Sequence, residues 1–194
     1  MLIGSQDIFP TRIFKYKLES QEEMKSKYLQ DMIDAYEDNK YDIPKGWVTD
    51  KVSTSFDSKN NQIIKDTPDE YGEIFDKLFD REWKGNFQFW HSVYKNGESQ
   101  EVHNHLPAMW SGIHFLKFDK KEHKPPIFFD PSRLAKSFNV VYHQGEDKFI
   151  PDVEEGDLII FPSYLEHCVP AGYYDTHRIT VAVNLKISYV ADQQ

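Results

Sequence analysis

The spacing of apolar residues changes from a helical to a strand-like period near residue 85. In the first part, an apolar stripe with helical spacing follows Ser20: Met24, Tyr28, Met32 and Ala35. Ser20 and Glu23 together form an S-x-x-E capping box. The pattern predicts a helix over about residues 21–37, preceded by an opening strand over residues 8–18.

A second helix is predicted after Thr67, which has the character of an N-cap, with Pro68 at the first helical position and Glu70 completing another capping box. Its apolar face consists of Tyr71, Ile74, Phe75, Leu78 and Phe79. The helix is expected to end between Trp83 and Gly85. The polar segment that joins the two helices, residues 38–66, is expected to be a loop with at most one short strand.

Beyond Gly85, short aromatic and β-branched runs alternate with turn residues, which is typical of strands. The expected strands are residues 87–94, a strand that leads into His103, and residues 110–118, 127–130, 138–143, 148–153, 157–162 and 178–187. Two helices followed by many short strands predict an α+β fold with a β-sandwich or jelly roll. No repeat or linker interrupts the chain, so we expect one domain over residues 1–194. Its helical support covers about residues 1–85 and its β core about residues 86–190.

Composition narrows the class of protein. The 194 residues carry a formal net charge of −9, which argues against binding to nucleic acid or an anionic membrane. Cys168 is the one cysteine, so no internal disulfide can form, and a small apolar role suits it better than that of a nucleophile. There is neither a signal-peptide pattern nor an apolar run of about twenty residues. We expect a soluble, cytoplasmic protein, and no feature indicates a homodimer.

The candidate chemistry lies in three histidines. His103 and His105 are one residue apart, so in an extended chain both rings point to the same face. His167 lies far along the chain in the run GDLIIFPSYLEHCVPAG, and Arg178 follows soon after it. Imidazoles gathered on one face can bind one metal ion. The sequence therefore predicts a metal site formed by His103, His105 and His167.

The ordered motifs resemble the 2-oxoglutarate and Fe(II)-dependent oxygenases, in the bacterial and phage subgroup related to prolyl 4-hydroxylases. The matching pieces are IFPTRIF, WHSVYKNGESQEVHNH, SG before an aromatic strand, FFDP, GDLIIFPSYLEH and HRITVAVN, between residues 8 and 187. The resemblance implies a double-stranded β-helix (a cupin-like jelly roll) with two N-terminal helices packed on it. The wider superfamily commonly has Asp or Glu at the second ligand, where this chain has His105.

The resemblance also implies roles for other residues. Arg178 is expected to pair with the distal carboxylate of 2-oxoglutarate, because a guanidinium fork matches a carboxylate. Thr180 and Asn184 share the strand face of Arg178 and are expected in the same pocket. His114 has two open interpretations, contact with the co-substrate or a core histidine with a hydrogen-bond partner. No catalytic residue beyond the metal ligands is expected.

The function implied by the resemblance is that of a hydroxylase-type dioxygenase that takes O2, Fe(II) and 2-oxoglutarate. Such an enzyme couples decarboxylation of 2-oxoglutarate to succinate with oxidation of a C–H bond in a peptidyl proline or a small molecule. Two alternatives stay open at this point. One is a cupin-like metalloprotein with three histidine ligands that does not use 2-oxoglutarate. The other is a non-catalytic β-sandwich interaction module.

Overall fold

The computed structural model describes residues 11–41, 44, 47, 50–56, 63–64, 68–78, 83–133 and 147–189. The elements within them, in chain order, are β1 (Phe14–Lys17), α1 (Gln21–Glu37), β2 (Ser53–Thr54), α2 (Asp69–Leu78), β3 (Trp83–Asn96), β4 (Gln100–His103), β5 (Trp110–Lys117), β6 (Ile127–Phe129), β7 (Lys148–Phe149), β8 (Asp157–Pro162), β9 (His167–Val169) and β10 (Tyr173–Tyr189). None of the helices in this part of the chain combines the length and apolar character needed to cross a membrane.

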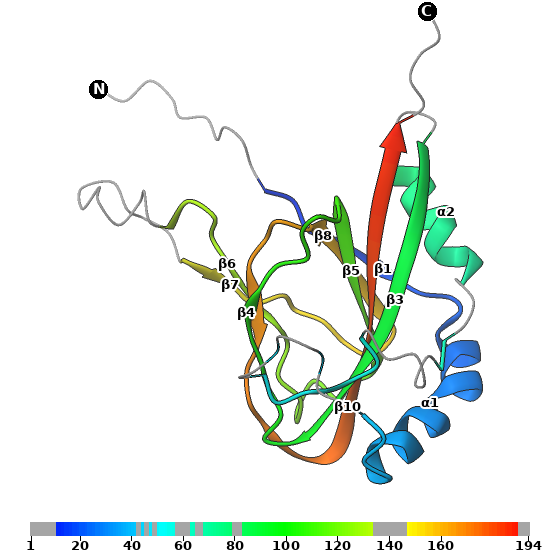
Figure 1. Ribbon diagram of the computed structural model, residues 1–194, viewed down its shortest axis with the longest axis vertical. Helices are drawn as coiled ribbons and strands as arrows, with labels where there is room; N and C mark the ends of the chain where they lie inside the picture. The colour runs from blue at the N-terminus through cyan, green and yellow to red at the C-terminus, as the bar shows by residue number, and fades with distance from the viewer. Residues whose placement is uncertain are drawn as a thin grey trace, which may run out of the picture.

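Two antiparallel sheets form the body of the molecule (Figure 1). The larger sheet has the strand order β1-β8-β5-β10-β3-β2, and the smaller has the order β4-β9-β6-β7. Neighbouring strands are mostly distant in sequence, as for β8 between β1 and β5. The described residues therefore form the predicted α+β arrangement, with strands from across the chain brought together.

Both helices cover the outer face of the larger sheet (Figure 1). The buried stripe of α1 consists of Gln21, Met24, Tyr28, Met32 and Ala35, and that of α2 of Tyr71, Ile74 and Phe75. These stripes pack against outward-facing residues of β10, among them Ile179, Val181, Val183 and Leu185. The predicted helical spacing is thus confirmed by burial.

The inner face of the larger sheet packs on the smaller sheet. Here β5 and β8 contribute Phe115 and Phe161, and β6 of the smaller sheet contributes Phe128. The rings of Phe128 and Phe161 lie 4.9 Å apart at their centroids, in an edge-to-face arrangement that aromatic pairs prefer. This aromatic layer forms the floor beneath the histidines described below.

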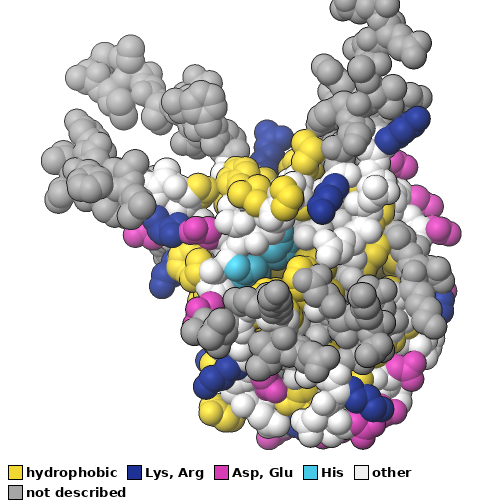
Figure 2. All heavy atoms as spheres, in the orientation of Figure 1, with side chains coloured by type: hydrophobic (Ala, Val, Ile, Leu, Met, Phe, Trp, Pro, Cys, Tyr) yellow, Lys and Arg dark blue, Asp and Glu magenta, His cyan; other side chains and the backbone are white. Residues whose placement is uncertain are grey.

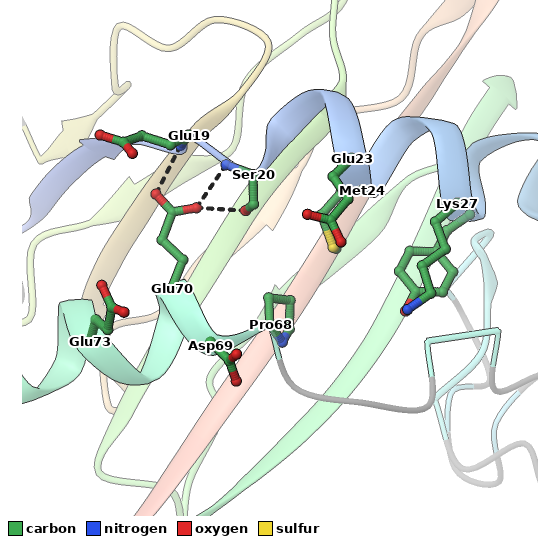
Figure 3. A pocket seen from close by; sticks show the side chains of 10 residues that line it. Glu19, Ser20, Glu23, Met24, Lys27, Pro68, Asp69, Glu70 and Glu73 are labelled. Atoms are coloured by element: carbon green, nitrogen blue, oxygen red, sulfur yellow. Dashed lines mark hydrogen bonds between the residues drawn. The ribbon is translucent and has the colours of Figure 1, made fainter.

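The start of α1 differs from the expected capping box. Ser20 makes no side-chain capping bond within its own helix. Instead the carboxylate of Glu70, from α2, accepts hydrogen bonds from the backbone N–H of Glu19 at 2.8 Å, the backbone N–H of Ser20 at 2.9 Å and the Ser20 hydroxyl at 2.5 Å (Figure 3). Glu70 was expected to cap its own helix. Its carboxylate instead caps α1, and these hydrogen bonds connect the start of α2 to the start of α1.

Several boundaries also differ from the sequence prediction. Within the described residues the second helix runs to Leu78, and β3 begins at Trp83, earlier than the expected strand start at residue 87. His167 was expected on a distant strand, and it begins the short strand β9. The segment between the helices contains the short strand β2, as expected. Thr67, Phe79 and the expected strand over residues 138–143 lie outside the described residues.

Candidate metal and co-substrate site

Three histidines meet at the edge of the smaller sheet. His103 ends β4, His167 begins β9, and the two are register partners. His105 lies two residues beyond β4, where its backbone N–H donates to the carbonyl of Ser163 at 2.9 Å. The ring centroids lie 4.3 to 5.3 Å apart. One potential ligand atom from each histidine lies within 4.8 Å of the others. The structure therefore brings together the three residues predicted as ligands.

His103 and His105 come together through a turn rather than through strand alternation alone. The strand stops at His103, and the side chain of Asn104 accepts a hydrogen bond from the backbone N–H of Leu106 at 3.2 Å. Such an Asx turn redirects the chain locally. With His105 also fixed by Ser163, its ring stacks beside that of His103 at an interplanar angle of 25°.

Each of the three rings uses Nδ1 for a hydrogen bond to an oxygen atom. The acceptors are the carbonyl of Glu101 at 2.7 Å from His103, the side-chain carbonyl of Asn184 at 2.9 Å from His105, and the carbonyl of Leu165 at 3.1 Å from His167. A carbonyl oxygen can only accept, so Nδ1 carries the proton in all three. Nε2 is then the atom with a lone pair, which is the form a metal-binding imidazole requires.

The electrostatics keep these rings neutral. Burial lowers the pKa of His105 to about 3, with a further contribution from His103, against a smaller opposing effect of the bond to Asn184. Burial also lowers the pKa of His103 and, more strongly, that of His167. Three neutral imidazoles that share one small space are ready to bind a cation without first losing protons.

A cavity of about 410 Å³ opens beside His103 and His105. One part of its wall is aromatic: Trp47 stacks on Phe56, Phe56 meets Trp90 edge-to-face, and the Trp90 ring lies 5.4 Å from that of His105. Polar residues complete the lining, namely Asp50, Gln88, Gln100, Asn104, Asn184 and Lys186, together with Leu106 and Pro107. Figure 2 shows histidine side chains reaching the surface beside hydrophobic ones on this face of the molecule.

Arg178 is buried on the inner face of β10, only 1% exposed. Its Nε donates to the carbonyl of Lys124 at 3.0 Å. Within the described residues its Nη1 has no hydrogen-bond partner and no carboxylate pairs with it. The guanidinium lies against the rings of Tyr94, Phe115 and Phe118, and burial lowers its pKa. A buried cation with an unused donor is costly unless an anion joins it, so Arg178 is a candidate partner for a carboxylate.

Thr180 and Asn184, the other predicted site residues of β10, lie on the face that strand alternation predicts. Thr180 and Asn184 are buried on the face of Arg178, whereas the intervening residues point to the helices. The hydroxyl of Tyr94 donates to Gln100 at 3.1 Å, and Gln100 lies on β4, the strand that carries His103. These contacts connect the surroundings of Arg178 to the histidine cluster.

The structure does not bring His114 to this site. Its Nδ1 lies 2.8 Å from the Tyr71 hydroxyl and its Nε2 lies 2.6 Å from Gln21 Oε1, both on helices. His114 and Ser111 are three residues apart on β5, so they face opposite sides of the sheet, and Ser111 is the one that faces the site. The expectation of a co-substrate contact is corrected, and the alternative, a core histidine with hydrogen-bond partners, describes His114.

Three other side chains that could take part in catalysis or metal binding, those of His177, His91 and Cys168, lie outside the histidine cluster. His177 bonds Glu37 on α1 at 2.8 Å, and His91 lies between Tyr41 and Ser55. Cys168 is partly buried on β9, and burial raises the pKa of its thiol. A raised pKa disfavours the reactive thiolate, so the structure supports the apolar interpretation of Cys168.

Sequence reasoning missed several residues of the site. Ser111 and Ser163 could have been found from strand alternation, because each is the polar residue at the end of an apolar inward-facing row. Trp47 and Phe56 had no such signal, since they lie in a polar segment without periodicity.

Comparisons with known proteins agree with this geometry. A family model described as "Putative 2OG-Fe(II) oxygenase" matches residues 88–184, which is half of the chain and includes all three histidines and Arg178. No curated protein is similar enough in sequence to count as a match. Among solved structures, a Pseudomonas putida prolyl-4-hydroxylase is similar at 13% identity and a TM-score of 0.57, covering 91% of this chain and 92% of that one.

Two further solved structures extend the likeness. A viral collagen prolyl hydroxylase from Paramecium Bursaria Chlorella virus-1, in complex with 2OG, is 13% identical, with a TM-score of 0.52 and coverage of 92% and 96% of the two chains. The non-heme alpha ketoglutarate dependent epimerase SnoN from nogalamycin biosynthesis is 12% identical, with a TM-score of 0.62 and coverage of 95% and 80%. At these identities the likeness concerns the fold. With the family match over half of its residues, the chain belongs to the 2OG-Fe(II) oxygenases, a family of oxidoreductases that use Fe(II) and 2-oxoglutarate.

Proposed function

We propose that this chain is a hydroxylase in which His103, His105 and His167 hold Fe(II) and Arg178 holds the distal carboxylate of 2-oxoglutarate. The observation that carries the proposal is the shared tautomer of the three histidines, each with Nδ1–H bonded to an oxygen atom. This arrangement leaves three neutral Nε2 donors in one cluster, as expected of a prepared metal site.

The donor set fits iron. Three imidazoles suit Fe(II), and a mononuclear centre with three protein ligands keeps positions open for co-substrate and O2. Bound Fe(II) and 2-oxoglutarate would supply the activation of O2 and the oxidising equivalents for C–H oxidation. The residues of the chain hold the ligands, neutralise the co-substrate and exclude water from an aromatic-walled cavity.

The surroundings of Arg178 support its proposed contact with the distal carboxylate of 2-oxoglutarate. Its buried, incompletely bonded guanidinium would gain a carboxylate partner, and aromatic rings on several sides keep competing water out. Thr180, buried two residues along the same face, is a proposed second contact of that carboxylate. The NH2 group of Asn184 has no partner within the described residues, and Asn184 lines the cavity, so it stays a proposed co-substrate contact.

We also propose that the two sheets form a double-stranded β-helix and that the whole chain is one domain, with both helices supporting its larger sheet. The shared burial of α1, α2 and β10 in the same core clusters supports this view.

The primary substrate is a peptidyl proline or a small molecule. Two of the similar structures are prolyl hydroxylases by description, and a third is an epimerase, so one fold accommodates different substrates. The aromatic wall of Trp47, Phe56 and Trp90 suits a substrate with an apolar ring.

The test is an anaerobic titration of the protein with Fe(II) and then 2-oxoglutarate, monitored by the weak visible charge-transfer band of the chelate. Stoichiometric appearance of the band, followed by 2-oxoglutarate-dependent O2 uptake and succinate formation, is the expected result. Metal binding without a band or keto-acid dependence would instead favour a cupin-like metalloprotein, and no metal binding would favour an interaction module.

A further inference from the structure

The side chain of Asn184 lines the cavity beside the histidines and lies between the ring of His105 and the hydroxyl of Ser111. Asn184 Oδ1 accepts one hydrogen bond from His105 Nδ1–H at 2.9 Å and another from the Ser111 hydroxyl at 2.8 Å. The Ser111 oxygen in turn lies 2.7 Å from the hydroxyl of Ser163. Because the single Ser111 proton goes to Asn184, Ser163 is the donor to Ser111.

Every member of this chain of hydrogen bonds is buried. Ser111 and Ser163 are 0% exposed, and Asn184 and His105 are at most 9% exposed. Ser111 and Asn184 are register partners on neighbouring strands β5 and β10, so the backbone ladder fixes their separation. The carbonyl of Ser163 also accepts the backbone N–H of His105 at 2.9 Å. His105 is thus held at both its backbone and its ring by the same short network.

His105 depends on this network more than the other two histidines depend on their partners. His103 and His167 each lie in a strand and bond the carbonyl of the residue two positions earlier, so their orientation is set locally. His105 lies outside a strand, and the acceptor for its ring comes from a side chain seventy-nine residues away in sequence. Loss of that acceptor would free this one ring while leaving the other two in place.

We propose, resting on the metal centre proposed above, that Asn184 is a positioning residue which orients His105 as the second metal ligand, with Ser111 and Ser163 fixing the plane of its amide. Removing the acceptor leaves the Nδ1–H of His105 buried and unpaired, and the ring can then turn away from the metal. Partners of this kind typically contribute about 10–100-fold to metal affinity.

The test uses the full-length protein labelled with 15N-histidine and loaded with Zn(II), a diamagnetic substitute for Fe(II). Three slowly exchanging Nδ1–H resonances are expected in the wild type, and His105→Ala identifies the one that belongs to His105. In Asn184→Leu this resonance should disappear, those of His103 and His167 should stay, and zinc affinity should fall about 10–100-fold. Asn184→Asp keeps an acceptor at the same place and should retain both the resonance and the affinity.

Ser55→Ala is the matched control, because it removes another buried hydroxyl that bonds a histidine Nδ1, that of His91 at 3.0 Å, outside the cluster. It should change none of the three resonances. Ser111→Ala, which should fold even where Asn184→Leu does not, is expected to weaken zinc binding and broaden only the His105 resonance.

Two results would overturn the positioning role. One is an unchanged His105 resonance with wild-type zinc affinity in Asn184→Leu. The other is equal loss of all three resonances in a folded Ser111→Ala protein, which indicates a general structural effect. Failure of the metal centre itself would look different: the wild type would not bind zinc stoichiometrically, while the His105 Nδ1–H bond to Asn184 could still be observed in the metal-free protein.

Discussion

The guanidinium carbon of Arg178 lies 4.7 Å from the centroid of the Tyr94 ring, and the two residues are register partners on β10 and β3. This contact stabilises the cation through the ring face while leaving Nη1 without a hydrogen bond. The larger sheet therefore presents a charged donor that is fixed in place before any anion arrives. Such pre-organisation reduces the entropy lost when a carboxylate binds.

Arg178→Ala should weaken 2-oxoglutarate binding while leaving Fe(II) bound. A bidentate, charge-assisted contact contributes on the order of 2–3 kcal/mol, which is about two decades of affinity. Arg178→Lys should give an intermediate affinity, because lysine keeps the charge but loses the fork. The measurement is the dissociation constant of 2-oxoglutarate under argon. Arg133→Ala, at a partly buried arginine paired with Glu166, is the control and should be unchanged. Equal affinities in all four proteins would place Arg178 outside the co-substrate pocket.

Removal of either His103 or His167 should abolish stoichiometric Fe(II) binding, because two remaining imidazoles hold a labile divalent ion poorly. Metal content after equilibrium dialysis under argon measures this directly. His177→Ala removes a histidine that bonds Glu37 away from the cluster and should bind iron like the wild type. Full metal content in His167→Ala would exclude this residue as a ligand.

The metal-free protein should lose stability as the pH falls below about 6.5. Burial lowers the pKa of His91 to about 4 and that of His114 to about 3. Between those values and 6.5 the unfolded chain takes up protons that the folded chain does not, so the free energy of unfolding decreases with falling pH. Each such histidine contributes up to about 1.4 kcal/mol per pH unit.

Urea unfolding at pH 7, 6 and 5 measures this dependence. In His91→Gln, one of the titrating groups is absent, so the decrease between pH 6 and pH 5 should be smaller by up to about 1.4 kcal/mol. A variant with the same pH dependence as the wild type would contradict a neutral, buried His91.

Glu70→Ala should destabilise the protein by about 1–2 kcal/mol, in the range of a lost helix cap. Burial opposes ionisation of Glu70, but the hydrogen bonds from Ser20 and Glu19 outweigh it and lower the pKa of the carboxyl group. Glu73→Ala, on the same helix and without such bonds to the part of the chain that the structure describes, should be close to neutral. Thermal unfolding of the two variants side by side tests the difference, and equal melting temperatures would remove Glu70 from this role.

The helices, most of the strands and the three clustered histidines were largely predictable, from local periodicity for the elements and from ordered motifs for the histidines. Alternation along residues 178–185 separated the helix-facing side chains from those on the other face, and the H-x-H spacing indicated His103 and His105, which lie together with His167 in the structure. Partners distant in the chain were not predictable. Glu70 reaches Ser20, and Asn184 reaches His105, only because the folded chain places their strands or helices side by side.

The position of His114 shows a different limit. A histidine at this position suggested a co-substrate contact. Side chains alternate between the two faces of β5, however, so Ser111 points to the inner face and His114 to the outer face. The inward position of Ser111, which strand alternation already indicated, is enough to place His114 on the opposite face.

The alternating burial of β10 also constrains how the gene for this chain can change. Even-numbered residues from Arg178 to Asn184 face the side of the candidate site, and odd-numbered residues from Ile179 to Leu185 pack in the core beneath the helices. A codon inserted or deleted within this stretch would exchange the two rows at once, burying the arginine under the helices and placing valines beside the histidines. Substitutions can alter chemistry or packing one at a time, whereas a length change here damages both together. We therefore expect the protein to tolerate changes of length only outside residues 178–185.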